Sequence, residues 1–147
     1  MQVREIIALK GGTLYTATPQ QSLASAIDTM AGFDVGSLVV MHEGKMAGML
    51  TFREVLLALK ERASADGLTV GDVMVKAPVT VFPDMEANDL RRLMIEKHSR
   101  YLPVLDGTLL MGVISFLDVA KAVLEEQSFE NKMLKSYIKN WPDEPQV

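Results

Sequence analysis

Two short phrases place a hydroxyl three residues ahead of an acid: Thr51 with Glu54, and Ser115 with Asp118. This spacing is typical of a capping box, in which the hydroxyl accepts a backbone N–H at a helix start and the acid accepts the N–H of the capping residue. The same groups could also bind a ligand. An ionised carboxylate has two acceptor oxygens and no donor, so it suits a vicinal diol. A helix N-terminus beside a hydroxyl favours a phosphate.

The two acids differ in how well they suit the cap. A capping box normally uses Glu or Gln, so Glu54 fits that role better than Asp118. Spacing alone favours helix caps at both positions and leaves ligand binding as the alternative. We therefore expect the carboxylate of Glu54 to be the one already occupied at its helix end.

Two arginines accompany these phrases. Arg53 directly precedes Glu54 and could supply a cation to one cleft, and Arg100 begins the run RYLPV. A solvated arginine at a turn between a helix and a strand is the simplest interpretation of Arg100. In the internal repeat described below, glycine at position 36 matches Arg100 and Leu117 matches Arg53. We therefore expect two chemically different sites, and leave open which arginine serves which.

The motifs of several enzyme classes are absent from the sequence. There is no P-loop, no G-x-G-x-x-G turn, no H-E-x-x-H helix and no G-x-S-x-G elbow. The two histidines, His42 and His98, lack the neighbouring groups that a catalytic site needs, so we expect them at the surface. The chain has no cysteine, which excludes disulfides, thiolate nucleophiles and zinc–cysteine sites. We expect no catalytic residues, no metal site and no required cofactor.

The composition is that of an ordinary globular protein, with 48% hydrophobic and 23% charged residues. The net charge of −4 argues against nucleic-acid or acidic-membrane partners, because both need a basic face. No apolar run approaches the roughly 18 residues of a membrane span. The N-terminal MQVREII is charged where a signal peptide would be apolar. We expect a cytoplasmic protein.

The sequence repeats itself with an offset of 64 residues. The two phrases above are one part of this repeat, and GMLTFREV at 48–55 matches GVISFLDV at 112–119. Identical or similar residues continue on both sides of them. The other matching pairs include Thr16 with Thr80, Pro19 with Pro83, Met30 with Met94, Leu38 with Leu102, Val40 with Val104 and Ala58 with Ala122.

Each repeat predicts the order strand, helix, strand, strand, helix. A short extended piece ends in proline, as in LYTATP and VTVFP. Apolar residues then recur at helical spacing, and Gly32 is the expected stop of the first helix. Two β-rich runs joined by a glycine turn indicate a hairpin, with Gly44 and Gly107 displaced by one position relative to each other. A second helix begins at each hydroxyl–acid phrase.

One such unit leaves a sheet face and two helix faces to cover, so two related units can cover each other. We therefore predict an α/β fold of two βαββα repeats packed about a pseudo-twofold axis, plus a C-terminal helix. The predicted division is 1–66 for the first repeat, 67–128 for the second, and 129–147 for the C-terminal helix and tail.

The duplicated unit, the run SRYLPV and the two hydroxyl–acid phrases together resemble a tandem pair of CBS domains, also called a Bateman module. The resemblance covers about residues 8 to 128, and the tail is similar to that of small stand-alone CBS-pair proteins. It implies a regulatory sensor, not an enzyme, that binds an adenosine-containing ligand: AMP, ADP, ATP or NAD. The alternatives are a structural dimer with vacant clefts, or an unrecognised enzyme that acts on a nucleotide.

The resemblance also assigns roles to residues. It implies that Asp118 binds ribose hydroxyls with Ser115 beside it, and that Arg100 contacts a phosphate. Glu54, Thr51 and Arg53 are the corresponding candidates in the first repeat, where the helix cap and the ligand site stay equally open for Glu54. The remaining candidates are the extended pieces around Thr16 and around Thr80 and Val81, whose backbone would face an adenine edge, the base-walling Leu50 and Ile114, and Met74 at the end of the linker.

The C-terminal segment carries apolar residues at helical spacing outside the repeat: Met133, Leu134, Tyr137, Ile138 and Trp141. This surface is left over once the duplicated core closes, so it predicts a contact between two copies of a homodimer. Packing of the segment on its own module is the alternative. Since the repeats account for most of the chain, we expect the output of the module to lie in an unknown protein target in trans.

Overall fold

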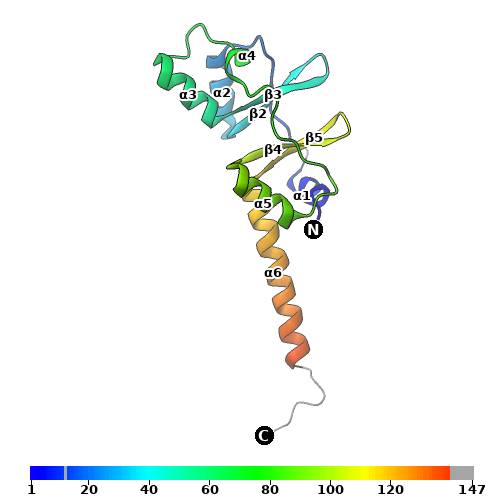
Figure 1. Ribbon diagram of the computed structural model, residues 1–147. Helices are drawn as coiled ribbons and strands as arrows, with labels where there is room; N and C mark the ends of the chain where they lie inside the picture. The colour runs from blue at the N-terminus through cyan, green and yellow to red at the C-terminus, as the bar shows by residue number, and fades with distance from the viewer. Residues whose placement is uncertain (12, 140–147) are drawn as a thin grey trace.

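The structure is a computed structural model, and it describes residues 1–11 and 13–139. The structure has two α/β repeats followed by a C-terminal helical extension (Figure 1), and each repeat is preceded by a short helix that was not predicted from the sequence. The elements are α1 (Val3–Lys10), β1 (Thr16–Ala17), α2 (Leu23–Phe33), β2 (Ser37–His42), β3 (Lys45–Thr51), α3 (Phe52–Arg62), α4 (Val70–Val73), α5 (Ala87–Lys97), β4 (Tyr101–Asp106), β5 (Leu109–Ser115) and α6 (Phe116–Lys139).

The two sheets have matching registers. In the first repeat β1 runs parallel to β2, and β2 pairs antiparallel with β3, with Val40 opposite Gly48. In the second repeat β4 and β5 form the same hairpin, with Val104 opposite Gly112. The predicted strand VTVFP shrinks to a single parallel bridge between Val81 and Val104. Its hydrogen bonds run from Val81 N–H to the Pro103 carbonyl and from Leu105 N–H to the Val81 carbonyl.

The hairpin turns differ in the way that the displaced glycines predict. In the first turn Glu43 and Gly44 both have positive φ angles, of 50° and 76°. In the second turn Gly107 comes first, with a φ of 63°. Position 43, which matches Gly107 in the repeat, is thus left-handed in both turns although it is glutamate in the first. The first turn has a second left-handed residue, and glycine occupies that position.

The first helix of each repeat ends at a left-handed residue that is not glycine. Asp34 caps α2 with a φ of 53° and ψ of 48°, and His98 caps α5 with 53° and 35°. The predicted stop at Gly32 was therefore wrong, since α2 continues through Phe33. An aspartate adopts the left-handed conformation more readily than most side chains, so the sequence offered two possible stops within three residues.

Each repeat has its own hydrophobic core, and each core contains residues from the segment that precedes the other repeat. Val3 and Ile6 of α1 are buried in the core of the second repeat, although α1 precedes the first. Val70 of α4, which precedes the second repeat, is buried in the core of the first. In Figure 1 the N-terminus accordingly lies beside the half that contains β4 and β5.

Backbone hydrogen bonds hold both exchanged segments. The N–H of Val3 donates to the Met85 carbonyl at 2.9 Å, and that of Arg4 to the Pro83 carbonyl at 2.9 Å. On the other side, the N–H of Val70 donates to the Gln21 carbonyl at 2.8 Å. The two exchanges are therefore specific backbone pairings and not only apolar contacts.

The linker after α4 passes directly over β3. Met49 and Val75 exchange two backbone hydrogen bonds, of 3.0 and 2.8 Å. A Cβ atom at Gly48 would overlap the carbonyl oxygen of Val75, so only glycine lets the linker come this close. At the matching Gly112, the nearest neighbour is Ile7 of α1. The two exchanged segments thus cover equivalent positions of the two hairpins.

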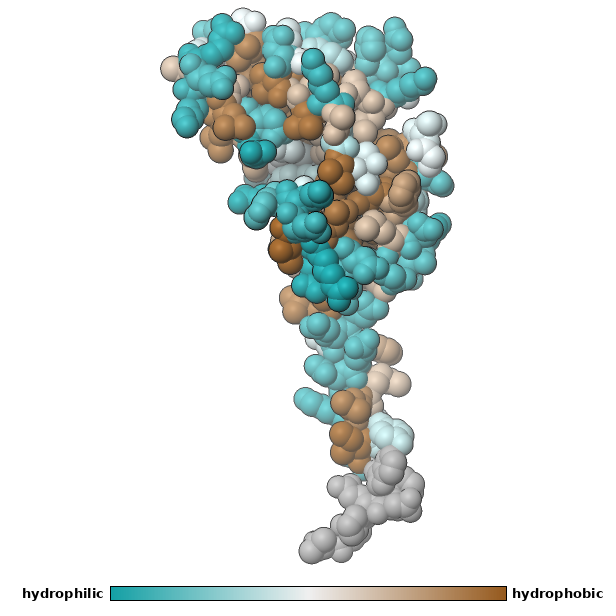
Figure 2. Space-filling view, in the orientation of Figure 1, coloured by the Kyte–Doolittle hydropathy of each residue, from teal (hydrophilic) through white to brown (hydrophobic). Residues whose placement is uncertain are grey.

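Helix α6 is longer than the repeat requires. It begins at Phe116 as the second helix of the repeat and continues without a break to Lys139, so the predicted C-terminal helix is its extension. The extension projects away from the rest of the molecule (Figure 1), and apolar side chains continue along it in Figure 2. The predicted packing residue Trp141 lies outside the described residues.

Because α1 packs in the core of the second repeat, a cavity created in α1 should destabilise the second repeat. Replacing Ile6 by Ala should lower the free energy of unfolding by about 2 to 5 kcal/mol, because a buried side chain is lost from the second core. Hydrogen exchange should quicken mainly in β4 and β5. Leu9→Ala is the matched control on the same helix, because Leu9 is 74% exposed. Faster exchange confined to β2 and β3 would contradict this assignment of α1.

Candidate functional site

The first of two cavities lies at the start of α6 and has a volume of about 470 Å³. We call it the Ser115 cleft. Its walls come from the end of α1 and the loop before β1, the start of β2, the start of β4, and the junction of β5 with α6. They include Lys10, Leu14, Tyr15, Gly36, Arg100, Tyr101, Gly112, Ser115 and Leu117.

The second cavity lies at the start of α3 and has a volume of about 690 Å³. We call it the Glu54 cleft. It is built from equivalent parts of the fold: the junction of β3 with α3, the linker after α4, and the segment between α5 and β4. Its walls include Thr51, Arg53, Glu54, Lys60, Ala77, Val79, Lys97, His98, Arg100 and Tyr101. Both volumes fall in the range of small-molecule sites.

Each cleft combines the two repeats in a crossed way. The hydroxyl of Ser115, from the second repeat, shares its cleft with Leu14 and Tyr15, which lead into β1 of the first. The phrase of the first repeat shares its cleft with Ala77 and Val79, which lead toward Val81 of the second. These runs are the parts of the chain that return from an exchanged helix to their own repeat.

Thr51 and Glu54 form a complete helix cap. The Oε1 atom of Glu54 accepts the Thr51 N–H at 3.0 Å and the Thr51 hydroxyl at 2.9 Å, and Oε2 lies 3.1 Å from the same hydroxyl. The residue Glu54 is only 9% exposed. Both of its oxygens are thus held by Thr51, as the capping interpretation predicts, although Glu54 also lines its cleft.

Ser115 and Asp118 form the same reciprocal cap, even though aspartate is the less usual acid for it. Asp118 Oδ2 accepts the Ser115 N–H at 2.9 Å, and the Asp118 N–H donates to the Ser115 hydroxyl at 3.0 Å. The expectation that Glu54 alone would be held by its helix end was therefore incomplete. In the part of the chain that the structure describes, no hydrogen bond reaches Oδ1 of Asp118, so this oxygen differs from those of Glu54.

Lys10 connects α1 to the second phrase. Its Nζ atom donates to Asp118 Oδ2 at 2.8 Å and to the Val113 carbonyl at 2.8 Å. Lys10 and Ser115 both line the cleft, whereas Asp118 lies at its edge, bonded to these two residues. The ion pair joins the exchanged helix to the helix start that it faces.

The ionisation of Asp118 follows from these contacts. Its partial burial alone would raise the pKa of the carboxyl group. The hydrogen bond from Lys10, the backbone hydrogen bond from Ser115 and the charge of Lys10 outweigh that effect and hold the pKa below its usual value. The carboxylate is therefore ionised at neutral pH and acts as an acceptor only.

The cations are distributed unequally. Arg100 lines both clefts, and Arg53 lines only the Glu54 cleft. The Glu54 cleft also has Lys60 and Lys97 in its walls. Within residues 1–11 and 13–139, the side chains of these four residues form no ion pair, unlike Lys10 in the other cleft. The Glu54 cleft is thus the more positively charged of the two.

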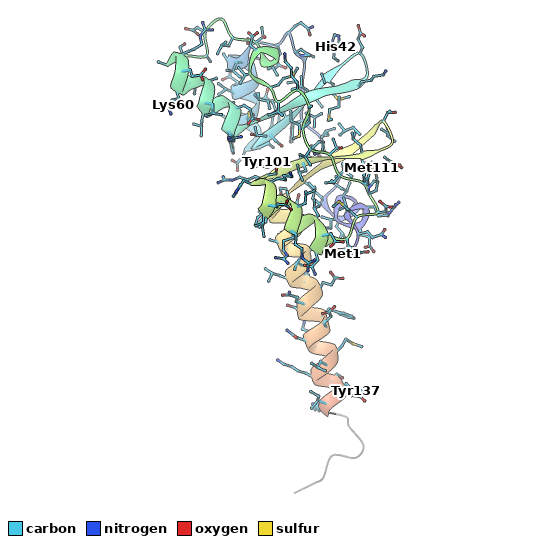
Figure 3. All side chains as sticks on the ribbon, viewed as in Figure 1. Met1, His42, Lys60, Tyr101, Met111 and Tyr137 are labelled. Atoms are coloured by element: carbon cyan, nitrogen blue, oxygen red, sulfur yellow. The ribbon has the colours of Figure 1, made fainter. Side chains whose placement is uncertain are left out.

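Tyr101 lies between the two halves of the molecule (Figure 3) and lines both clefts. Its ring packs directly on Gly36, where a Cβ atom would overlap the tyrosine hydroxyl and would lie 2.8 Å from the ring of Phe52. The absence of a side chain at position 36, the repeat mate of Arg100, therefore has a steric cause.

The other predicted residues lie behind the cavity walls or beside them. Leu50, Ile114 and Val81 are fully buried core residues. Thr16 lies in β1, one residue beyond the wall residue Tyr15, and Thr80 follows Val79 in the same way. Met74 packs against Gly48. None of these six residues is part of either cavity wall, so any contact from the extended segments would come from the residues just before Thr16 and Thr80.

Sequence reasoning did not find Lys10, Tyr15 or Tyr101. Lys10 and Asp118 are 108 residues apart in the chain, and no repeat or motif connects them. Tyr101 directly follows Arg100 in the run that carries the resemblance, and Tyr15 directly precedes Thr16, so these two had a local signal and Lys10 had none. Position 37, the repeat mate of Tyr101, is serine, which removes the signal of that tyrosine from the first repeat.

Residues 1–11 and 13–139 contain no group of three or more His, Cys, Asp or Glu side chains arranged to hold a metal ion. None of the helices among them has the length and apolar character needed to cross a membrane.

Comparison with known proteins agrees with the duplicated architecture. The family model of the CBS domain matches residues 4–61 and 70–125. The CBS domain-containing protein YhcV of Bacillus subtilis is 29% identical over 113 residues, spanning 77% of this chain and 81% of that protein. The crystal structure of the CBS-domain containing protein ATU1752 from Agrobacterium tumefaciens is 27% identical with a TM-score of 0.79, and the match covers 83% and 98% of the two chains.

A crystal structure of CBSX2 in complex with AMP has the same fold, with a TM-score of 0.71 at 24% identity over 86% of this chain and 98% of that one. The two family matches coincide with the two structural repeats and confirm the resemblance read from the sequence. The chain therefore belongs to the CBS-domain family, as a tandem pair of CBS domains.

Proposed function

We propose that this protein is a regulatory module that binds an adenine nucleotide in the Ser115 cleft. The observation that carries the proposal is the second hydroxyl–acid phrase: an ionised carboxylate with one uncommitted oxygen, beside a helix start and at the edge of a cavity that Ser115 and Arg100 line. This combination suits a ligand that has both a diol and a phosphate. The AMP complex of CBSX2 supports an adenosine ligand by analogy of fold.

The groups of the cleft divide naturally among the parts of a nucleotide. Asp118 accepts hydrogen bonds from the ribose diol through Oδ1. The hydroxyl of Ser115, at the positive end of α6, and the guanidinium of Arg100 bind the phosphate. The backbone of Leu14 and Tyr15 takes the role that the sequence assigned to Thr16, and offers hydrogen-bonding groups to the edge of the base.

The Glu54 cleft has a different specificity. Both oxygens of Glu54 already accept hydrogen bonds from Thr51, so a ribose diol must compete with the helix cap. Arg53, Lys60 and Lys97 favour a ligand with more phosphate charge, such as ADP, ATP or a dinucleotide. The Ser115 cleft is thus the stronger site for AMP, and the Glu54 cleft takes a different ligand or binds the same one more weakly.

The crossed construction of the clefts makes a sensor role physically reasonable. A ligand in the Ser115 cleft contacts the second repeat through the start of α6 and the first repeat through the loop before β1. It therefore favours one relative orientation of the repeats over others, which is the condition for a shift in population. A protein target in trans reads that orientation. The rival functions are a structural module with vacant clefts and a nucleotide-processing enzyme.

Saturating nucleotide should stabilise the fold. A ligand present at 100 times its dissociation constant adds about 2.7 kcal/mol to the free energy of unfolding if it binds only the folded state. Thermal and urea unfolding with AMP, ADP, ATP and NAD in turn measures this effect, with CMP as the non-adenine control. Stabilisation without turnover of the nucleotide supports a sensor. No shift with any of the four supports the structural module, and turnover supports an enzyme.

Neutralising the two acids should have unequal effects. Asp118→Asn should weaken AMP binding by about 1 to 3 kcal/mol, because an amide accepts hydrogen bonds from the diol less well than a carboxylate. Glu54→Gln should change AMP affinity less, because Glu54 is held by Thr51. Isothermal titration calorimetry compares the two variants, with Asp66→Asn in the linker as the matched control.

A second ligand separates diol binding from helix capping. The 2′-deoxy form of AMP lacks one hydroxyl and should lose affinity for the natural protein but little further affinity for Asp118→Asn. A greater loss of AMP affinity from Glu54→Gln than from Asp118→Asn would reverse the ranking of the clefts. Unchanged affinity in both variants would leave the two acids as helix caps only.

A further inference from the structure

The extension of α6 exposes apolar side chains that the molecule itself does not cover. Beyond Val123 the helix leaves the second core, and Leu124, Leu134 and Ile138 are each more than half exposed. Glu126 still bonds to the amino group of Met1 at 2.8 Å. The part of the helix from residue 127 to 139 is about 20 Å long, and Figure 1 shows it standing clear of both repeats. An isolated helix of this length is only marginally stable in water. A partner that covers its apolar side would stabilise it.

One stripe of α6 has the spacing of a coiled coil. Positions 117, 120, 124, 127, 131, 134 and 138 alternate in steps of three and four residues, and we call them the outer stripe. They hold Leu, Ala, Leu, Gln, Asn, Leu and Ile. The stripe is separate from Val119 and Ala122, which are buried in the second core. Leu117 and Leu124 are exposed where α6 still lies on the body, and Ala120 between them is partly exposed.

The residues of the outer stripe favour two parallel helices. In heptad terms 117, 124, 131 and 138 are a positions, and 120, 127 and 134 are d positions. Ile138 at a with Leu134 at d is the combination that favours two-stranded parallel coiled coils. Asn131 occupies an a position. A single asparagine at an a position of a coiled coil pairs with the same asparagine of the partner helix and fixes the register.

The charges beside the stripe also fit a parallel pair. Glu130 occupies a g position and Lys135 the e position five residues later. In a parallel pair in register, Glu130 of each copy lies beside Lys135 of the other, so one contact occurs twice about the twofold axis. Over the described part of the chain, neither side chain has an ion pair within the molecule. In an antiparallel pair, the e positions of one helix would face the e positions of the other. These positions hold Lys121, Ser128 and Lys135, so Lys135 would find no acidic partner there.

We propose that the outer stripe of α6 pairs with the same stripe of a second copy of this chain, as a short parallel two-stranded coiled coil. The occupant of the exposed surface is thus a second CBS pair, held in register by Asn131 and by the reciprocal Glu130–Lys135 contacts. The bodies of both copies lie at the same end of the paired helices, since both helices leave their bodies in the same direction. The proposal concerns α6 and does not depend on nucleotide binding.

Light scattering on the full chain at tens of micromolar tests the pairing. The natural protein should show about twice the mass of one chain. Leu134→Glu should return the mass to that of one chain, because it places a charge in the stripe. Met133→Glu is the matched control, since Met133 is equally exposed but lies off the stripe, and it should leave the dimer intact. A single-chain mass for the natural protein, or a dimer that survives Leu134→Glu, would overturn the proposal.

Two further sets of variants test orientation. Glu130→Lys and Lys135→Glu should each weaken the dimer, and the double exchange should restore it; Lys132→Glu, on the opposite side of the helix, should not weaken it. The chain has no cysteine, so introduced ones report cleanly. Leu124→Cys and Ile138→Cys should each give a disulfide-linked dimer on mild oxidation, and Lys132→Cys should not. Linkage at only one of the two stripe positions, or at neither, would exclude a parallel pair in register.

Discussion

The rest of the structure depends on one constraint: neither repeat buries its core with its own residues alone. The second core needs Val3 and Ile6 from the helix before the first repeat, and the first core needs Val70 from the helix before the second. The chain must therefore cross between the halves after each of these helices. The two crossing runs become walls of the two clefts, so the cavities are a direct result of how the apolar surface is covered.

The duplication supplies two clefts of the same plan, and a few side chains then make them chemically different. The side chain of Glu54 is one methylene longer than that of Asp118. Both carboxylate oxygens of Glu54 accept hydrogen bonds, whereas Oδ1 of Asp118 accepts none from the described residues. Lys10 compensates the charge of Asp118 from the exchanged helix, whereas Glu54 accepts its hydrogen bonds from the neutral groups of Thr51 in its own cap. Such differences alter the chemistry of the clefts at little cost to the fold, because the backbone hydrogen bonds of both helix starts remain the same.

The parts of the structure that the sequence predicts are those with a local signal. The offset of 64 residues, the alternation of strand and helix and both hydroxyl–acid phrases depend on neighbouring residues, and the structure has all of them. What it could not predict is non-local. The pair Lys10–Asp118 and the crossed origin of the cleft walls depend on the exchange of α1, which has no sequence motif. The predicted end of α2 was wrong for a local reason, because Asp34 adopts the left-handed conformation that glycine usually supplies.

The contact of Tyr101 with Gly36 also limits how this duplication can have diverged. Two identical halves would have to carry the same residues at these matched positions on both sides of the contact. A pair of second halves would put Arg100 where Gly36 now lies, against the tyrosine ring, and there is no room there even for a methyl group. A pair of first halves would lack both the arginine and the ring. The two halves have thus become complementary and no longer interchangeable, so a symmetric ancestor assembled from either present-day half would not close in this way.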